Sequence, residues 1–351
     1  MRVKHIAMIS PRYKPAIGGV EKHVEEVVKE LLKRGIKCDV FTSSQAQNNE
    51  CDSLYDGARV YRLPNGWGSF PILILLWLWK RKKEFPRYSI IHVHDAIPLL
   101  IWFPILKLVF PKVPVFATFH GFERDPIPGY FKVLRQLAQK LVKGTICVGV
   151  FIQKHYRIKC DWITYGAISS VDRGTEKKNG ALFIGRLERD TGIEDYLRSL
   201  IILKEQYNID LRLTVCGEGS LRNSLEAISQ KNGITVDFLG PLLNTTTLLK
   251  TNRFSFASGY LSIVESMAYG LPVLSVANSP LKHDYLKSIQ NQKAPILLHS
   301  SAKAIAHTVQ KLMTDRAFEE RISTSSKNWV SKMTWTELVE GYLTIWRKVR
   351  N

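Results

Sequence analysis

Short runs of apolar and β-branched residues alternate with helical patterns along most of this chain. A strand-like run at residues 5–10 leads through Gly18 and Gly19 into a pattern with apolar residues three and four positions apart. Gly35 stands where a left-handed cap would end that helix, and residues 37–42 read as the next strand. Such alternation predicts an α/β fold with doubly wound parallel sheets.

The length and a break in the rhythm predict two domains. A chain of 351 residues exceeds the size at which a single core stops growing. The apolar rhythm fades between residues 159 and 178 and restarts with a strand at 181–185. We therefore expect a first domain at 1–165, a second at 166–332, and an amphipathic C-terminal helix within 333–351.

The formal charge of +19 is concentrated in the first half of the chain. Residues 1–165 hold 26 Lys and Arg against 13 Asp and Glu, whereas the remainder hold 24 against 18. Nucleic acid, an anionic membrane surface and a phosphorylated substrate all suit such a charge. The sequence has no zinc-finger spacing, aromatic-rich RNA-binding strand or basic zipper, so nucleic acid is the weakest of the three.

The cysteines and the N-terminus favour a cytoplasmic protein. The five cysteines are scattered and contain no Cys-x-x-Cys pair, which favours a reduced compartment. The chain opens directly on a strand-like run, so no export is expected. The cysteines are Cys38, Cys51, Cys147, Cys160 and Cys216.

Three separated motifs carry a family resemblance. Glu265 follows the apolar residues 261–264, and we expect it to begin a helix that ends at Gly270. Gly18 and Gly19 open another helix, and a strand ends on Gly185 and Arg186. Together these motifs resemble the retaining glycosyltransferases of the family 4 type (glycosyl transferases group 1). The resemblance covers about the whole chain. It implies the GT-B architecture, with two Rossmann-like domains facing a cleft and a terminal helix that returns to the first domain.

A sugar-linked diphosphate needs backbone N–H donors, the positive end of a helix and a fixed cation. Gly18 and Gly19 supply the first two, although a glycine turn that serves only chain geometry explains them as well. Arg186 follows a strand-end glycine at the edge where open α/β sheets bind ligands, and its guanidinium can hold two phosphate oxygens at once.

The resemblance assigns further roles. It places Glu265 on the ribose, the Gly217 and Gly219 turn near the donor, and His120 beside the sugar and the reaction centre. A dipole-stabilising helix acid, a plain turn and a strand-end histidine remain the alternatives. We expect His120 and Arg186 to be catalytic. The expected donor-binding residues are Gly18, Gly19, Arg186, Gly217, Gly219, Gly240, Leu242 and Glu265.

Two positions depart from the family pattern. Thr191 stands where a lysine is usual, with Arg189 as a nearby substitute, and Ala257 stands where an earlier glutamate usually touches the transferred sugar. The identity of the donor, and turnover itself, are therefore open. A catalytically inactive nucleotide-binding or scaffold protein is the alternative.

A histidine cluster at a strand end raises the question of metal. His92 and His94 lie on one face of a strand and precede Asp95, which is geometry that a metal can use. The resemblance implies that no metal is required. We expect no metal and no cofactor beyond the nucleoside diphosphate sugar, which is the donor substrate.

An apolar segment at residues 70–79 ends in a basic run. It is too short to cross a bilayer, and the second apolar run at 96–110 contains two prolines. The segment could lie on an anionic membrane leaflet or form a buried helix with a solvated basic end. The candidate membrane or acceptor residues are Trp77, Trp79, Lys80, Arg81, Lys82 and Lys83.

The sequence thus predicts a retaining, metal-independent glycosyltransferase that moves a hexose from a nucleoside diphosphate sugar to a hydroxyl of a glycan or lipid-linked acceptor. The expected location is cytoplasmic, with a peripheral position on the inner face of the membrane left open.

Overall fold

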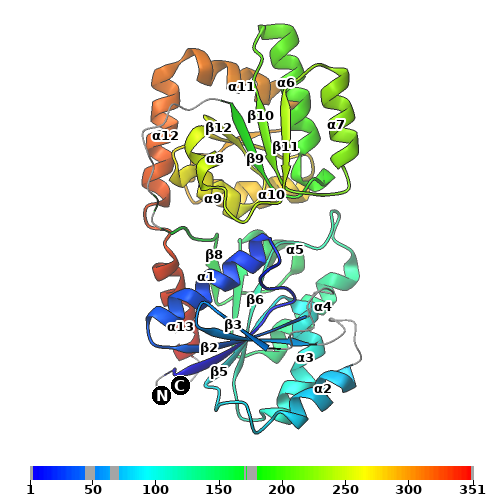
Figure 1. Cartoon of the computed structure of the whole chain (residues 1–351), viewed down its shortest axis with the longest axis vertical. Helices are drawn as coiled ribbons and strands as arrows, with labels where there is room; N and C mark the ends of the chain where they lie inside the picture. Colours follow the sequence, from blue (N-terminus) through cyan, green and yellow to red (C-terminus); the bar gives the residue numbers. More distant parts are fainter. Residues whose placement is uncertain (1–2, 44–51, 64–70, 170, 172–179, 349–351) are drawn as a thin grey trace. The chain divides into compact units, whose positions relative to one another are not determined.

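The computed structural model describes residues 3–43, 52–63, 71–169, 171 and 180–348, and its chain divides into two compact units (Figure 1). Met1–Thr164 and Trp335–Asn351 make up the first unit, and Tyr165–Thr334 makes up the second. The sequence pattern places the boundaries after residues 165 and 332. Residues 172–178 of the expected linker lie outside the described residues.

The first unit is built on one sheet. Its strands are β1 (His5–Ile9), β2 (Lys37–Ser43), β3 (Asp52–Tyr55), β4 (Ala58–Leu63), β5 (Ile90–His94), β6 (Val115–Phe119), β7 (Thr145–Val148) and β8 (Trp162–Thr164). The strand order is β3-β4-β2-β1-β5-β6-β7-β8, and only the β3–β4 pair among these is antiparallel. Every residue of β5 and β6 is buried, as a parallel sheet between helical layers requires.

Six helices accompany this sheet in the described residues: α1 (Gly19–Lys33), α2 (Pro71–Lys80), α3 (Ala96–Val109), α4 (Gly129–Leu141), α5 (Phe151–Tyr156) and α13 (Trp335–Lys348). The C-terminal helix α13 packs beside α1, while α2, α3 and α4 form a row (Figure 1). The predicted cap of α1 is confirmed, because Gly35 has a φ of 72° and its N–H donates to the Leu32 carbonyl at 2.9 Å.

The second unit has a wholly parallel sheet. Its strands are β9 (Ala181–Ile184), β10 (Leu213–Cys216), β11 (Val236–Gly240), β12 (Phe254–Phe256), β13 (Val273–Val276) and β14 (Leu297–His299), in the order β11-β10-β9-β12-β13-β14. The accompanying helices are η1 (Arg189–Thr191), α6 (Ile193–Tyr207), α7 (Arg222–Lys231), α8 (Thr246–Thr251), α9 (Tyr260–Ala268), α10 (Pro280–Gln290), α11 (Ala302–Thr314) and α12 (Arg316–Val330). The predicted α/β class with two parallel-sheet domains is confirmed.

Helix α9 begins earlier than the sequence suggested. The expectation that Glu265 begins a helix is wrong, because Gly259 is the extended residue before α9 and Glu265 lies in the second turn. Tyr260, Ile263 and Val264 form the buried stripe of this helix. Glu265 is therefore too far from the helix start to serve as a dipole-stabilising first-turn acid.

Two cysteines are paired. A disulfide joins Cys147 of β7 to Cys160, whose Cα atoms are 5.9 Å apart, a pairing that the reduced compartment favoured by the sequence did not anticipate. Folding brings them together across 13 positions, a spacing that indicates no pair by itself. Cys38 and Cys216 are free and buried, and Cys51 lies outside the described residues.

Candidate functional site

Three neighbouring strands of the second unit end in glycine turns that are bonded to one another. The N–H of Gly185, after β9, donates to the carbonyl of Cys216 at 3.0 Å, and the N–H of Gly217, after β10, donates to the carbonyl of Gly240 at 2.9 Å. Because β11, β10 and β9 are adjacent and parallel, all three turns lie at one carboxyl edge of the sheet. That edge is where ligands of open α/β sheets bind.

The glycines in these turns are also required by close backbone contacts. A Cβ on Gly217 would collide with the carbonyl oxygen of Gly185, and a Cβ on Gly219 would collide with that of Leu187. Gly217 also has a φ of 148°, which other residues rarely adopt. Loop packing therefore accounts for these two glycines whether or not a ligand binds.

Arg186 projects from the first of these turns. Its side chain is 68% exposed, and its Nη2 lies 2.8 Å from the Asp190 carboxylate. Beside it, Glu188 accepts hydrogen bonds from the N–H and hydroxyl of Ser220 at 2.8 and 2.7 Å, which ties the β9 and β10 turns together. These bonds lower the pKa of Glu188, so it stays charged beside Arg186.

The two departures from the family pattern have structural roles. Thr191 is buried, and its hydroxyl donates to the Glu188 carbonyl at 2.7 Å. Ala257 is fully buried, and its carbonyl accepts a bond from the Ser275 hydroxyl at 2.7 Å. Neither position brings a charge to this edge of the sheet.

The sequence interpretation missed a lysine at the same edge. Lys282 lies on α10, is only 4% exposed, and donates from Nζ to the carbonyl of Ser258 at 2.8 Å. Tyr285, one turn later, is buried close enough to Asp190 and Arg186 for their charges to act on its pKa, which burial raises. A lysine inside an ordinary amphipathic helix gives no sequence signal of such a location.

Helix α1 of the first unit begins at the predicted glycine pair. Gly18 precedes the helix in an extended conformation, and no side chain caps it. The carboxylate of Glu21 folds over Gly18, since a Cβ at that position would overlap it. A phosphate at this helix end would have to displace Glu21, while Gly19 has open space where its Cβ would be.

His120 lies immediately after β6 and is bonded to the end of β5. Its Nε2 lies 2.9 Å from Nδ1 of His94, and its N–H donates to the Asp95 carboxylate at 2.8 Å. The predicted grouping of His92, His94 and Asp95 thus becomes one cluster with His120. Among the described residues, no three His, Cys, Asp or Glu side chains are arranged to hold a metal.

Burial keeps the imidazoles of this cluster neutral. It lowers the pKa of His23 to about 4, that of His92 to about 3 and those of His94 and His120 well below the usual value. It also raises the pKa of Asp95 to about 6. Near pH 7 each of these imidazoles therefore carries one N–H.

Two members of the cluster were not expected from the sequence. His23 comes from α1 and meets the ring of His120 edge to face, with centroids 5.0 Å apart. Tyr342 comes from α13 and lies 2.9 Å from Nε2 of His23, although 319 residues separate them in the chain. No local motif signals a contact over such a distance.

Helix α2 is buried on one side and exposes apolar side chains on the other. Ile74 and Leu78 are buried, whereas Ile72 and Trp79 are about 60% exposed. Trp77 differs from Trp79, because it packs against Phe41, Tyr61 and Phe85. One face of α2 is therefore buried, as one of the two predictions requires, and the other face is exposed. Phe70 lies outside the described residues.

The basic residues at the end of α2 also differ in their exposure. Arg81 turns inward over the Trp77 ring and pairs with Glu84 at 2.8 Å, whereas Lys82 lies over Trp79. Lys80 and Lys83 are exposed. None of the helices in the described part of the chain is both long and apolar enough to span a bilayer.

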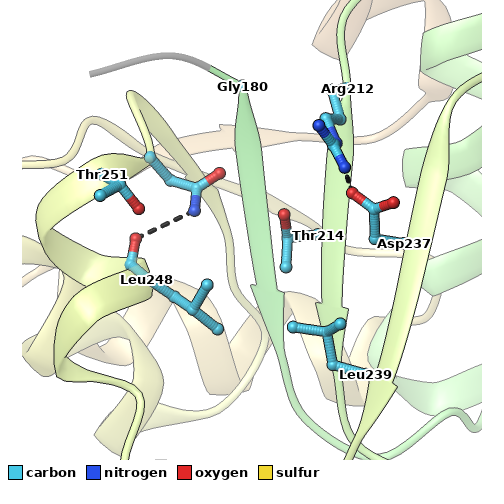
Figure 2. A pocket seen from close by; sticks show the side chains of 8 residues that line it. Gly180, Arg212, Thr214, Asp237, Leu239, Leu248 and Thr251 are labelled. Carbon is cyan, nitrogen blue, oxygen red and sulfur yellow. Dashed lines mark hydrogen bonds and ion pairs between the residues drawn. The ribbon is translucent and has the colours of Figure 1, made fainter. Parts of the chain in front are cut away.

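A hollow of about 500 Å³ lies on the second sheet beside α8 (Figure 2). Gly180, Thr214 and Leu239 are among its lining residues, and an ion pair between Arg212 and Asp237 closes one side (Figure 2). None of the predicted donor-binding residues lines it. The hollow and the glycine-turn edge are therefore separate features of this unit.

Two family models match the chain. The model described as Glycosyltransferase Family 4 matches residues 17–160, and the model described as Glycosyl transferases group 1 matches residues 168–329. Together they cover most of both units.

Curated relatives and solved structures agree with these matches. A Campylobacter jejuni α-1,4-N-acetyl-D-galactosaminyltransferase, named for an undecaprenol-diphosphate-linked substrate, is 23% identical over 68% of this chain and 70% of its own. An uncharacterised glycosyltransferase of Methanocaldococcus jannaschii is 22% identical over 97% of each chain. Among structures, Thermosynechococcus elongatus sucrose-phosphate synthase has a TM-score of 0.77, with 16% identity and 99% of each chain covered. Anabaena HepE, solved with UDP and glucose, has a TM-score of 0.75, with 13% identity over 97% of this chain and 99% of its own.

Proposed function

The chain belongs to the group 1 glycosyltransferases with the GT-B fold, and on that premise we propose that it transfers a hexose from a nucleoside diphosphate sugar to a hydroxyl group of a glycan or a lipid-linked acceptor. The observation that carries the donor assignment is the set of bonded glycine turns at the carboxyl edge of β9, β10 and β11. Glu265 then binds the ribose, and the turn from Gly240 to Leu242 meets the base.

The proposed reaction retains configuration and needs no metal. The bond between the anomeric carbon and the diphosphate breaks as the acceptor oxygen joins the same face, and the acceptor proton passes to the leaving diphosphate. Arg186 and the amides of Gly18 and Gly19 oppose the charge that develops on that group. One preorganised donor of this kind contributes about 3–4 kcal/mol to the transition state. His120 lies beside the transferred sugar.

A second cation for the diphosphate is Lys282 in this proposal, in place of the lysine that Thr191 replaces. Its support is a buried ammonium at the end of β12, on the same helix as Tyr285, which lies near Arg186. Lys282→Gln should weaken binding of a nucleoside diphosphate several-fold, whereas Lys287→Gln, an exposed change on the same helix, should not. Calorimetric titration measures both, and equal affinities in the two variants would remove Lys282 from the site.

The proposed acceptor side is the first unit, with an anionic membrane surface as a partner. The exposed apolar face of α2 beside Lys80, Lys82 and Lys83 supports it. Helix α4 also exposes an apolar stripe outward, from Tyr130 to Leu141. The exposed stripe consists of Tyr130, Val133, Leu137 and Leu141.

The Campylobacter relative, which acts on an undecaprenol-linked glycan by its name, supports a lipid-linked acceptor. In this proposal the protein is cytoplasmic and binds the inner face of the membrane peripherally. No role is proposed for nucleic acid.

Turnover of a donor panel tests the function. The purified chain is mixed with nucleoside diphosphate sugars, with and without membrane extract, and free diphosphate and labelled product are measured. We expect one donor to be consumed, with product appearing only when extract is present. Arg186→Ala serves as the inactive control, because its exposed side chain should not affect folding.

A second candidate is a nucleotide-binding protein without turnover. The loss of charge at both Thr191 and Ala257 favours it, since Ala257 occupies the place of an acid that touches the sugar in the family. It predicts nucleotide binding with no donor consumed across the whole panel.

A further inference from the structure

Two buried histidines of the first unit, His92 and His23, belong to one continuous chain of hydrogen bonds. Trp346 Nε1 lies 3.1 Å from His92 Nδ1, and His92 Nε2 lies 2.8 Å from the Thr118 hydroxyl. The Thr118 hydroxyl lies 2.8 Å from that of Tyr342, which lies 2.9 Å from His23 Nε2. Its two ends, Trp346 and His23, come from α13 and α1.

The direction of this chain follows from its first member. An indole N–H only donates, so His92 Nδ1 must accept and the proton of neutral His92 must be on Nε2. That Nε2–H then donates to Thr118. The Thr118 hydroxyl hydrogen goes to Tyr342, and the Tyr342 hydroxyl hydrogen goes to His23 Nε2.

If the hydrogen bonds ran in the opposite direction, the Thr118 hydroxyl would have no acceptor for its hydrogen. If Tyr342 donated to Thr118, the Thr118 hydroxyl would accept two bonds and its own hydrogen would have no acceptor among the contacts of the described residues. Thr118 is fully buried, so water does not reach it. Leaving a buried donor unsatisfied costs more than the bond itself contributes.

We propose that Tyr342 and Trp346 of the C-terminal helix are positioning residues for His120, because they fix His92 as its Nε2–H tautomer and His23 as its Nδ1–H tautomer. His120 packs on His23 at 5.0 Å and bonds to His94, whose ring lies 5.1 Å from that of His92. The helix thus holds His23, which packs directly on His120, and His92, which packs on His94. The consequence of this proposal for catalysis rests on the proposed role of His120, whereas the predicted tautomers of His92 and His23 do not depend on that role.

Long-range ¹⁵N–¹H spectra of the full-length protein with labelled histidine test the proposal directly, because they show which ring nitrogen carries the proton. In the parent protein near pH 7 we expect a single tautomer for each residue, Nε2–H for His92 and Nδ1–H for His23. A proton on Nε2 of His23, or on Nδ1 of His92, would overturn the proposal without any variant.

Trp346→Phe removes the donor that sets the direction, at the end of the hydrogen-bond chain opposite His23. We expect the chain to reverse in part, so that His23 becomes a mixture of tautomers. Tyr342→Phe cuts the chain, and should change His23 while leaving His92 as Nε2–H. A packing role alone would move neither proton, so a single Nδ1–H form of His23 in both folded variants contradicts the proposal.

The matched control is Trp329→Phe, since this indole donates to the Gln292 carbonyl in the second unit. It should leave every tautomer of the cluster unchanged. If transfer activity is measurable, Tyr342→Phe should lower kcat on the order of tenfold with an unchanged donor KM, as expected when a reactive group is misplaced. Intact tautomer effects without measurable transfer would count against the proposed function alone.

Discussion

The two units place their candidate residues in opposite environments. In the first unit His94 is buried, His120 and Asp95 are half-buried, and the three residues are bonded to one another across 25 or 26 positions of the sequence. In the second unit Arg186 extends from a turn into solvent, and the turn conformation depends on neighbouring glycines. A substitution in this histidine cluster should therefore alter both stability and activity, whereas one at an exposed residue such as Arg186 can alter activity alone.

The largest expected effect is that of replacing Arg186, which should lower activity without changing stability. Arg186→Ala should lower kcat/KM for donor turnover by about 10²–10³-fold, because one preorganised donor to the developing charge is lost. The free energy of unfolding should stay unchanged, because the side chain is largely exposed and surface ion pairs contribute little. Steady-state kinetics and urea unfolding of the same preparation measure both.

Arg198 provides the matched control for that change. Its side chain is 64% exposed and pairs with Asp195, so Arg198→Ala removes a comparable surface ion pair from the same unit. It should retain full turnover. Equal losses in the two variants would contradict a specific role for Arg186.

The enclosed histidines predict a dependence of stability on pH. Burial lowers the pKa of His23 from 6.5 to about 4, so between these pH values the unfolded chain binds the extra proton. The contribution of His23 to the free energy of unfolding is fully present above about pH 6.5 and is lost as the pH falls through 4. The total loss is about 3 kcal/mol. The raised pKa of Asp95 acts in the opposite direction below pH 6, so the comparison needs a variant.

His23→Gln should remove the contribution of this imidazole, so the increase in the free energy of unfolding between pH 4.5 and pH 7 becomes smaller by about 2 kcal/mol. The contribution of Asp95 is common to both proteins and cancels. His283 is exposed on α10, and His283→Gln should leave the gain as in the parent. An unchanged pH dependence in His23→Gln would mean that its imidazole is already charged when folded.

Replacing a glycine by alanine should affect the free energy of unfolding differently at Gly217 and at Gly19. Gly217→Ala forces a Cβ against the Gly185 carbonyl at a φ of 148° and should lower the unfolding free energy by roughly 2 kcal/mol. Gly19→Ala meets no atom within 4 Å and should leave stability unchanged. A loss of turnover in Gly19→Ala at full stability would then indicate an approach of the donor phosphates, as proposed. Full turnover would favour a plain turn.

The sequence predicted the features that depend on local patterns. Strand-ending glycines and helical spacing gave the two parallel-sheet units, the cap at Gly35 and the turns at Gly185 and Gly217. The start of α9 was misplaced because Leu261 to Val264 suit a strand as well as a buried helix face. The extended backbone of Gly259, directly before Tyr260, places these residues in the helix.

Contacts between distant segments could not be predicted. The bond between His23 and Tyr342 spans 319 residues, and the disulfide at Cys147 depends on the loop that returns Cys160 beside β7. Lys282 is similar, since its burial results from packing against the end of β12. The residues at turns thus had sequence signals, whereas those held by tertiary contacts had none.

The smallest expected effect concerns the exposed side of α2. Lys82 lies over the Trp79 ring and points outward with it, so Lys82→Gln removes one charge from the proposed membrane face without disturbing the buried side. One lysine near an anionic surface contributes about 1 kcal/mol, so binding to anionic vesicles should fall about fivefold in a sedimentation assay. Lys231→Gln, an exposed change in the second unit, should have no such effect, and neutral vesicles should bind both variants equally. If the parent protein fails to bind anionic vesicles, the apolar face of α2 contacts something other than a membrane, because its charge would then have no anionic lipid partner.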